Sequence, residues 1–138
     1  MNHLEIALAE YGVSEIKGEL DNPEILKYFN EIGFNGDQFK DETAWCSAFV
    51  NWACHKSNLR RSNALNARSW LNVGESVYSP RIGDVVVFWR ESKDSWKGHV
   101  GFYINTVGDM IYVLGGNQGN KVCISPYHKD MLLDFRRL

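Results

Sequence analysis

The order of apolar and polar residues divides the chain into a helical first part and a later part built of strands. Helical patterns cover residues 4–10, 22–29 and 44–56, and a weaker one covers residues 64–73. Asn22 followed by Pro23 is typical of a helix N-cap and first turn. These patterns predict three helices and a fourth, less regular one.

After Pro80 the pattern changes to short apolar runs that are separated by turns. Such runs predict strands, at residues 84–89, 99–104, 110–114, 121–124 and 132–136. Val107-Gly108-Asp109 predicts a hairpin between the second and third of these strands, so we expect an antiparallel meander. Helices followed by strands predict an α+β fold, and the length of 138 residues suits one domain, residues 1–138.

Composition and charge restrict the partners. The formal net charge is -2 and 23% of the residues are charged, so there is no overall positive field to attract nucleic acid. No apolar run approaches the ~20 residues that span a bilayer, so we expect no membrane insertion. The first twelve residues lack the basic leader of a secretory signal, which predicts synthesis in the cytoplasm without a signal peptide.

The cysteines show no pairing pattern. Cys46, Cys54 and Cys123 form no Cys-x-x-Cys motif, and they do not combine with the four histidines at the spacing of a structural zinc site. We therefore expect free thiols, no metal and no cofactor.

Cys46 stands directly after a helix-start signal. The preceding residues are all suited to a cap or a first helical turn: Asp41, Glu42 and Thr43. The free N–H groups and the dipole at a helix start favour a thiolate, so this position predicts a lowered pKa and a nucleophile. The helix is apolar on almost every side, with one narrow polar stripe of Ser47, Asn51, His55 and Asn58, which predicts a buried central helix. A cysteine in an ordinary core stripe is the alternative.

Four histidines are candidates for a base that would act on Cys46. His55 lies nine residues along the same helix, roughly 13 Å away at 1.5 Å per residue, which is too far. His3 lies in a terminal helix and His128 in a turn, where an exposed histidine needs no function. His99 begins a strand after Gly98, and strand alternation directs its neighbours to the opposite, core-facing side: Val100, Phe102 and Ile104. A structural histidine at a strand end is the alternative.

A general base needs a polar partner that fixes its ring. A three-residue hairpin loop, residues 107–109, would place Asn117 opposite His99, whereas a two-residue loop would select Gln118. Either amide can accept a hydrogen bond from the ring. The glycine-rich sequence around them also fits a simple turn.

Four segments together resemble a known family. In chain order they are TAWCSAFV (residues 43–50), RIGDVVVF (81–88), GHVGFY (98–103) and VLGGN (113–117). This order is similar to that of the CHAP and NlpC-type cysteine peptidases, which hydrolyse amide bonds in bacterial cell-wall peptides. The resemblance implies a papain-like fold in which N-terminal helices and a central nucleophile-bearing helix pack on a C-terminal antiparallel sheet.

The resemblance also implies roles for individual residues. Cys46 would be the nucleophile, His99 the base and Asn117 the polar third member, and Gly83-Asp84 would form the turn before the first core strand. One position departs from the family pattern, because many CHAP relatives have an acidic residue where this chain has Gly115. The identity of the third member, Asn117 or Gln118, therefore stays open.

The implied function is hydrolysis of an amide bond of peptidoglycan through a thioester, as an endopeptidase or amidase. The implied partner is the peptidoglycan stem peptide, and we expect a monomer that acts on the cell wall, either as a phage lysin or as a delivered effector. The residues identify no inhibitor or immunity protein. Two other hypotheses fit the sequence: a cysteine deamidase or transglutaminase-like effector that acts on proteins, and a non-catalytic phage module that retains the fold.

Overall fold

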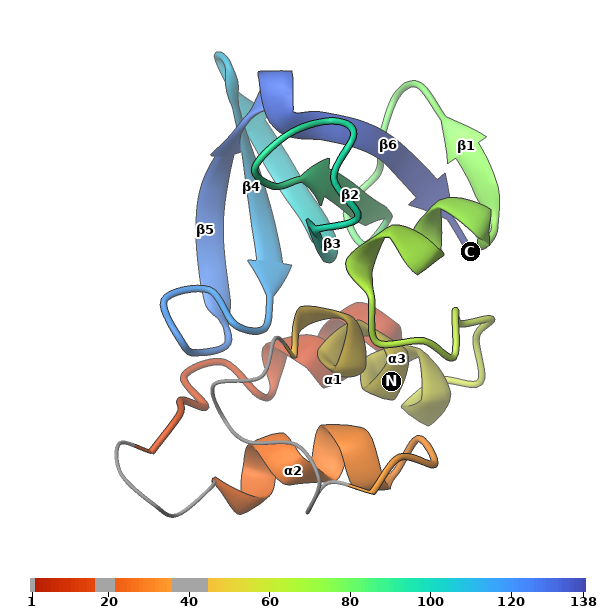
Figure 1. Ribbon diagram of the computed structural model, residues 1–138, viewed down its shortest axis with the longest axis vertical. Helices are drawn as coiled ribbons and strands as arrows, with labels where there is room; N and C mark the ends of the chain where they lie inside the picture. Colours follow the sequence, from red (N-terminus) through yellow and green to blue (C-terminus); the bar gives the residue numbers. More distant parts are fainter. Residues whose placement is uncertain (1, 17–21, 36–44) are drawn as a thin grey trace.

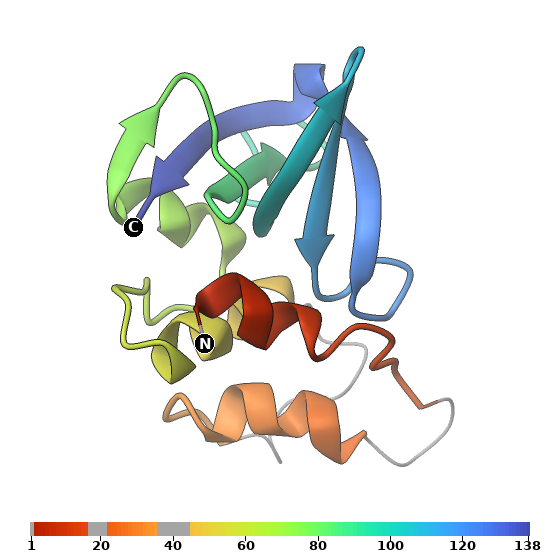
Figure 2. The same ribbon diagram turned by 180° about the vertical axis from the view of Figure 1, so that it is seen from behind.

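The computed structural model describes residues 2–16, 22–35 and 45–138. The helices within them are α1 (His3–Leu8), α2 (Pro23–Asn30), α3 (Cys46–Lys56) and the 3-10 helices η2 (Ala67–Asn72) and η3 (Lys129–Met131). The strands are β1 (Glu75–Val77), β2 (Val85–Trp89), β3 (Gly98–Val107), β4 (Met110–Gly115), β5 (Cys123–His128) and β6 (Leu132–Arg137). Figures 1 and 2 show α1, α2 and α3 gathered on one side of the sheet.

The two N-terminal helices begin where their capping residues predict. The Asn2 side chain accepts a hydrogen bond from the Glu5 N–H, and the Glu5 carboxylate accepts one from the Asn2 N–H, which together form a capping box. Asn22 caps α2 and Pro23 occupies its first turn, as predicted. Buried Tyr28 of α2 packs edge-on against Phe49 of α3, with ring centroids 5.1 Å apart, so α2 covers one side of the central helix.

The central helix α3 is buried from Cys46 to Cys54, which confirms the prediction for this helix. Its polar stripe is also buried over the first two turns. The Ser47 hydroxyl donates to the Ala64 carbonyl at 2.7 Å, and Asn51 Oδ1 accepts from the Asn63 N–H at 2.9 Å. Trp70 of η2 donates its indole N–H to the Ser47 hydroxyl at 3.0 Å. Because buried polar groups require partners, these bonds fix the segment after α3 against the helix.

The strands form one six-stranded antiparallel sheet in the order β1-β6-β2-β3-β4-β5. The predicted meander is correct for β2 to β5. The last strand departs from it, because β6 returns to pair with β2 rather than with β5. Strand β1, which has only three residues and pairs with β6, had no counterpart in the prediction.

Both faces of the sheet are covered. One face packs on the helices and contributes Val85, Val87, Val100, Phe102 and Leu114 to the main core. The other face forms a second cluster from Val86, Phe88, Ile111, Val113 and Phe135. Burial of both faces explains why β2 is a continuous apolar run in the sequence. The predicted orientation of Val100 and Phe102 toward the core, opposite to His99, is confirmed.

Candidate active site

Cys46 is the first residue of α3 and has only 4% of its surface exposed. It lines a pocket of about 450 Å³, which we call the Cys46 pocket. The rest of its wall comes from residues 65–67 after α3, residues 96–98 before His99, and Arg90, Glu91 and Met131. The N-cap residue is Trp45, which makes no side-chain capping bond, and the predicted cap Thr43 lies outside the described residues.

The predicted lowering of the Cys46 pKa is wrong for the resting site. Burial raises the pKa of the Cys46 thiol above its ordinary value. Backbone hydrogen-bond interactions with Val100 and Ser47 and the positive charge of Arg90 act in the opposite direction, and they offset only part of the effect of burial. The resting cysteine is therefore a thiol.

His99 is the second residue of β3, and its ring is held by its neighbours. It pairs with Phe88 of β2 and is 4% exposed. Its imidazole stacks on the Tyr127 ring of β5, with centroids 4.9 Å apart and an interplanar angle of 23°, and Tyr127 stacks in turn on Phe88. The stack fixes the plane of the imidazole and so restricts the directions in which its two nitrogens can form hydrogen bonds.

The His99 ring forms a hydrogen bond with the side-chain amide of Gln118. His99 Nε2 and Gln118 Oε1 are 2.9 Å apart. The amide nitrogen of Gln118 donates to two carbonyl oxygens, that of Cys123 at 2.6 Å and that of Val113 at 3.2 Å. These two acceptors fix which end of the amide is nitrogen, so Oε1 must accept from His99. His99 therefore carries its proton on Nε2, and Nδ1 presents a lone pair.

The predicted contact between Asn117 and His99 is absent. The hairpin has a two-residue turn, because Val107 pairs with Met110, but a bulge between Tyr103 and Asn105 restores, from Tyr103 back toward His99, the register of a three-residue loop. Strand β4 ends at Gly115, and Asn117 adopts a left-handed φ of 57°. The chain thus turns at Asn117 and returns Gln118 to the histidine. Asn117 and His99 both line a pocket of about 180 Å³, which we call the His99 pocket.

Gly115 makes room for this arrangement. A Cβ at position 115 would lie 2.7 Å from Gln118 Oε1 and 3.4 Å from His99 Nε2. A side chain there would occupy the place that Gln118 fills. With glycine at position 115, the polar partner of His99 comes from Gln118, three residues later in the chain.

Burial also sets the protonation state of His99. Burial is the largest cause that lowers the pKa of His99 from 6.5 to about 4; the hydrogen bond to Gln118 acts in the opposite direction, and the Arg90 charge adds to the lowering. The imidazole is therefore neutral at pH 7. At pH 7 the Cys46 thiol and the His99 imidazole are therefore both neutral.

Three observations connect Cys46 with His99. The sulfur interacts with the backbone of Val100, the residue next to His99. A charge on Cys46 would raise the pKa of Tyr127, whose ring stacks on His99. Arg90 and Met131 line both the Cys46 pocket and the His99 pocket, so these two pockets adjoin. We call these two neighbouring pockets the cleft; Cys46 lines one of them and His99 lines the other.

The other histidines have structural settings. His55 is exposed at the end of α3, as predicted. The ring of His128 accepts a hydrogen bond from the Asp130 N–H and caps η3. His3 is half-buried, and its Nε2 lies 2.7 Å from the Gly83 carbonyl oxygen. No group of three metal-ligating side chains occurs in the part of the chain that the structure describes.

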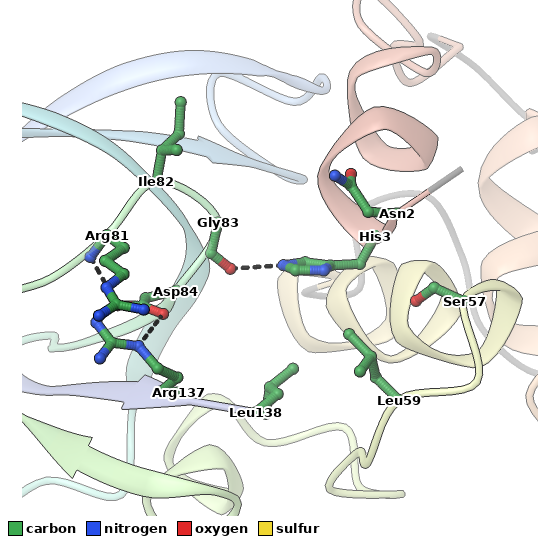
Figure 3. A pocket seen from close by; sticks show the side chains of 10 residues that line it. All are labelled: Asn2, His3, Ser57, Leu59, Arg81, Ile82, Gly83, Asp84, Arg137 and Leu138. Atoms are coloured by element: carbon green, nitrogen blue, oxygen red, sulfur yellow. Dashed lines mark hydrogen bonds and ion pairs between the residues drawn. The ribbon is translucent and has the colours of Figure 1, made fainter.

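A further pocket, of about 320 Å³, lies where α1 meets the turn before β2 (Figure 3). Asp84 in this turn accepts hydrogen bonds from the Arg81 N–H at 2.7 Å and from the Arg137 guanidinium at 2.8 Å. The predicted turn at Gly83-Asp84 is present. Its polar groups bind one another and hold α1, β2 and β6 together.

Sequence reasoning did not single out Tyr127, whose ring stacks on the imidazole. Tyr127 belongs to no motif, so only the fold could have identified it. Arg90 lines both pockets. Of three aromatic residues in the second half of the chain, Trp89 lines the His99 pocket, while Trp70 is buried in the core and Tyr78 is 97% exposed elsewhere.

Comparison with known proteins identifies the family. The model of the CHAP domain matches residues 38–117, more than half of the chain. The chain belongs to the CHAP domain family. CHAP domains are typically peptidoglycan amidases or endopeptidases, which act on the cell wall. The resemblance predicted from the four sequence segments is confirmed.

A solved structure supports the fold of this CHAP domain. It is a protein described as similar to a lipoprotein, of the NLP/P60 family, from Staphylococcus aureus subsp. aureus Mu50. The TM-score is 0.54 at 17% identity, and the match covers 97% of this chain and 39% of that one. The predicted papain-like α+β fold is thus confirmed, and the chain spans about two-fifths of the length of this structural relative. No curated protein sequence matches the chain.

No helix in the described ranges of this CHAP domain combines the length and the apolar character needed to cross a bilayer.

Proposed function

We propose that this CHAP domain hydrolyses an amide bond in the peptide of peptidoglycan, with residues 1–138 acting as one unit. Cys46 is the nucleophile, His99 is the general base and acid, and Gln118 orients His99. Both biological roles that fit the sequence, phage lysin and delivered effector, would use this reaction. The reaction needs no cofactor.

The reaction begins from the neutral pair. Nδ1 of His99 takes the thiol proton as the Cys46 sulfur attacks the amide carbonyl carbon. The imidazolium returns this proton to the leaving amine, which leaves a thioester on Cys46. His99 then deprotonates a water molecule that attacks the thioester, and the products are a carboxylic acid and the free thiol.

The negative oxygen of each intermediate needs a donor. The backbone N–H of Cys46 is in the first turn of α3, where N–H groups have no acceptor within the helix. This N–H belongs to the nucleophilic residue itself and points along the helix axis, so it is the natural donor to the oxyanion.

The observation that carries this proposal is the bonding of Gln118. Because its amide nitrogen donates to two carbonyl oxygens, its oxygen holds the Nε2 proton of His99 and leaves Nδ1 basic. A base that takes the thiol proton through Nδ1 requires this tautomer.

Mass spectrometry of muropeptides tests the proposal. Purified peptidoglycan is incubated with the wild type and with Cys46→Ala, His99→Ala and Cys54→Ala. We expect new products from the wild type and from Cys54→Ala, which removes another buried cysteine of α3 outside the cleft, and none from the other two variants. The product masses identify the bond that is cleaved.

Two results would contradict the proposal. Digestion by Cys46→Ala at the wild-type rate would favour a module that only binds the wall. Absence of digestion by the wild type, combined with release of ammonia from glutamine-containing proteins, would favour a deamidase.

A further inference from the structure

Arg90 occupies the junction of the cleft. It follows the last residue of β2, and its backbone N–H donates to the Lys97 carbonyl at 3.3 Å. Its side chain is exposed and lines both the Cys46 pocket and the His99 pocket. A substrate that occupies both pockets would therefore contact the Arg90 side chain.

Lys97, the other cation that lines the cleft among the described residues, and Arg68 behind the rim loop both have partners. Lys97 Nζ forms an ion pair with the Glu91 carboxylate at 2.8 Å. The Arg68 guanidinium donates to the carbonyl oxygens of Ser92, Lys93 and Lys97 at 2.7–3.0 Å and so holds the loop that forms the rim. Within the described ranges, the Arg90 guanidinium forms no hydrogen bond or ion pair, so it is available to an anion.

The position of this charge has an electrostatic cost for the reaction. Arg90 favours the thiolate of Cys46, but it disfavours the protonated form of His99. The attack on the amide creates an imidazolium in a buried site, where an uncompensated positive neighbour is unfavourable. An anion on Arg90 would remove this repulsion when the substrate binds.

We propose that Arg90 binds a carboxylate of the substrate beside the scissile amide, so that the domain selects acidic peptides. The inference rests on the proposed function and adds the substrate class to it. Guanidinium and carboxylate make two parallel hydrogen bonds, which would also fix the orientation of the peptide in the cleft. In a stem peptide the carboxylate can belong to an internal acidic residue or to the C-terminus.

The test uses a synthetic stem peptide that spans the bond identified by mass spectrometry. It is made in three forms: with all carboxylates free, with the internal carboxylate converted to a carboxamide, and with the C-terminal carboxylate converted. Cleavage of each form is measured as kcat/KM for the wild type, Arg90→Gln and Arg60→Gln. Arg60 is an exposed arginine that lines neither pocket of the cleft, so its variant changes the net charge equally.

We expect the wild type and Arg60→Gln to cleave one carboxamide form roughly 10- to 100-fold more slowly than the free acid, which is the range for losing a hydrogen-bonded charge pair. That form identifies the carboxylate that binds. Arg90→Gln should cleave this form and the free acid at equal rates. The ratio of the two rates cancels any change in the reactivity of Cys46, so it reports recognition alone.

Two outcomes overturn the inference. Equal cleavage of all three forms by the wild type, or unchanged discrimination in Arg90→Gln, removes the role of Arg90 and leaves the proposed hydrolysis intact. If the wild type cleaves none of the three forms, the proposed function and this inference fail together.

Discussion

Replacing Gln118 with alanine would test how His99 is oriented. The substitution removes the acceptor 2.9 Å from His99 Nε2 and the donor to the Val113 and Cys123 carbonyls. Without this acceptor, no hydrogen bond would favour the His99 tautomer that carries its proton on Nε2. In the other tautomer the proton sits on Nδ1, the nitrogen that should accept the thiol proton.

The size of the effect follows from the burial of these groups. Leaving a buried donor or acceptor unpaired costs about 1–3 kcal/mol, and tenfold in rate corresponds to about 1.4 kcal/mol. We therefore expect kcat/KM of Gln118→Ala to fall roughly 10- to 100-fold. The loss should be smaller than that for Cys46→Ala, because the nucleophile remains.

The pH profile separates orientation from general damage. The hydrogen bond to Gln118 favours protonated His99, so its removal lowers the pKa of His99 below about 4. The acid limb of kcat/KM should start near pH 4 in the wild type and move to lower pH in Gln118→Ala. Asn117→Gly is the matched control, since glycine tolerates the left-handed φ of 57° and should change kcat/KM by less than about threefold.

The reasoning would be refuted if Gln118→Ala kept wild-type kcat/KM, or if Asn117→Gly lost more activity than Gln118→Ala. An acid limb near pH 6.5 in the wild type would also refute it, because His99 would then titrate like an exposed histidine.

Three further predictions concern neighbouring residues. Gly115→Ala should reduce kcat/KM about as much as Gln118→Ala, because the new Cβ would lie only 2.7 Å from Gln118 Oε1 and would displace the amide. The rate of peptidoglycan digestion measures this. When the pH falls from 6.5 to 4, the free energy of unfolding of the wild type should fall by on the order of 3 kcal/mol more than that of His99→Gln, because only unfolded His99 binds a proton in this range. Denaturant titration at several pH values measures this difference. Arg68→Ala should speed tryptic cleavage after Lys93 and Lys97, because three bonds to that loop are lost; timed proteolysis measures this.

Local signals predicted much of this structure. Asn22 and Pro23 marked the start of α2, the apolar run after Cys46 marked the buried helix, and His99 was correctly placed at the start of a strand. Each of these features depends on a few consecutive residues, so the sequence carries it directly.

The remaining features depend on contacts between distant segments. The pairing of β6 with β2 joins residues almost fifty positions apart. The partner of His99 depends on the end of β4 at Gly115 and on the turn at Asn117, neither of which apolar patterning specifies. Whether the Cys46 pKa is raised or lowered depends on how completely the thiol is desolvated, and the raising effect of burial is larger than the lowering effects at the helix start.

The contact between Gly115 and Gln118 constrains how this site can evolve. An acidic side chain at position 115 and the present glutamine compete for the same volume, so neither residue can be exchanged independently. Acquiring the acid first would expel the amide, whereas shortening residue 118 first would leave a vacant space that the acid can enter. Because either change made first should lower activity, the two positions should show sign epistasis, and the exchange should be favourable only when both residues change.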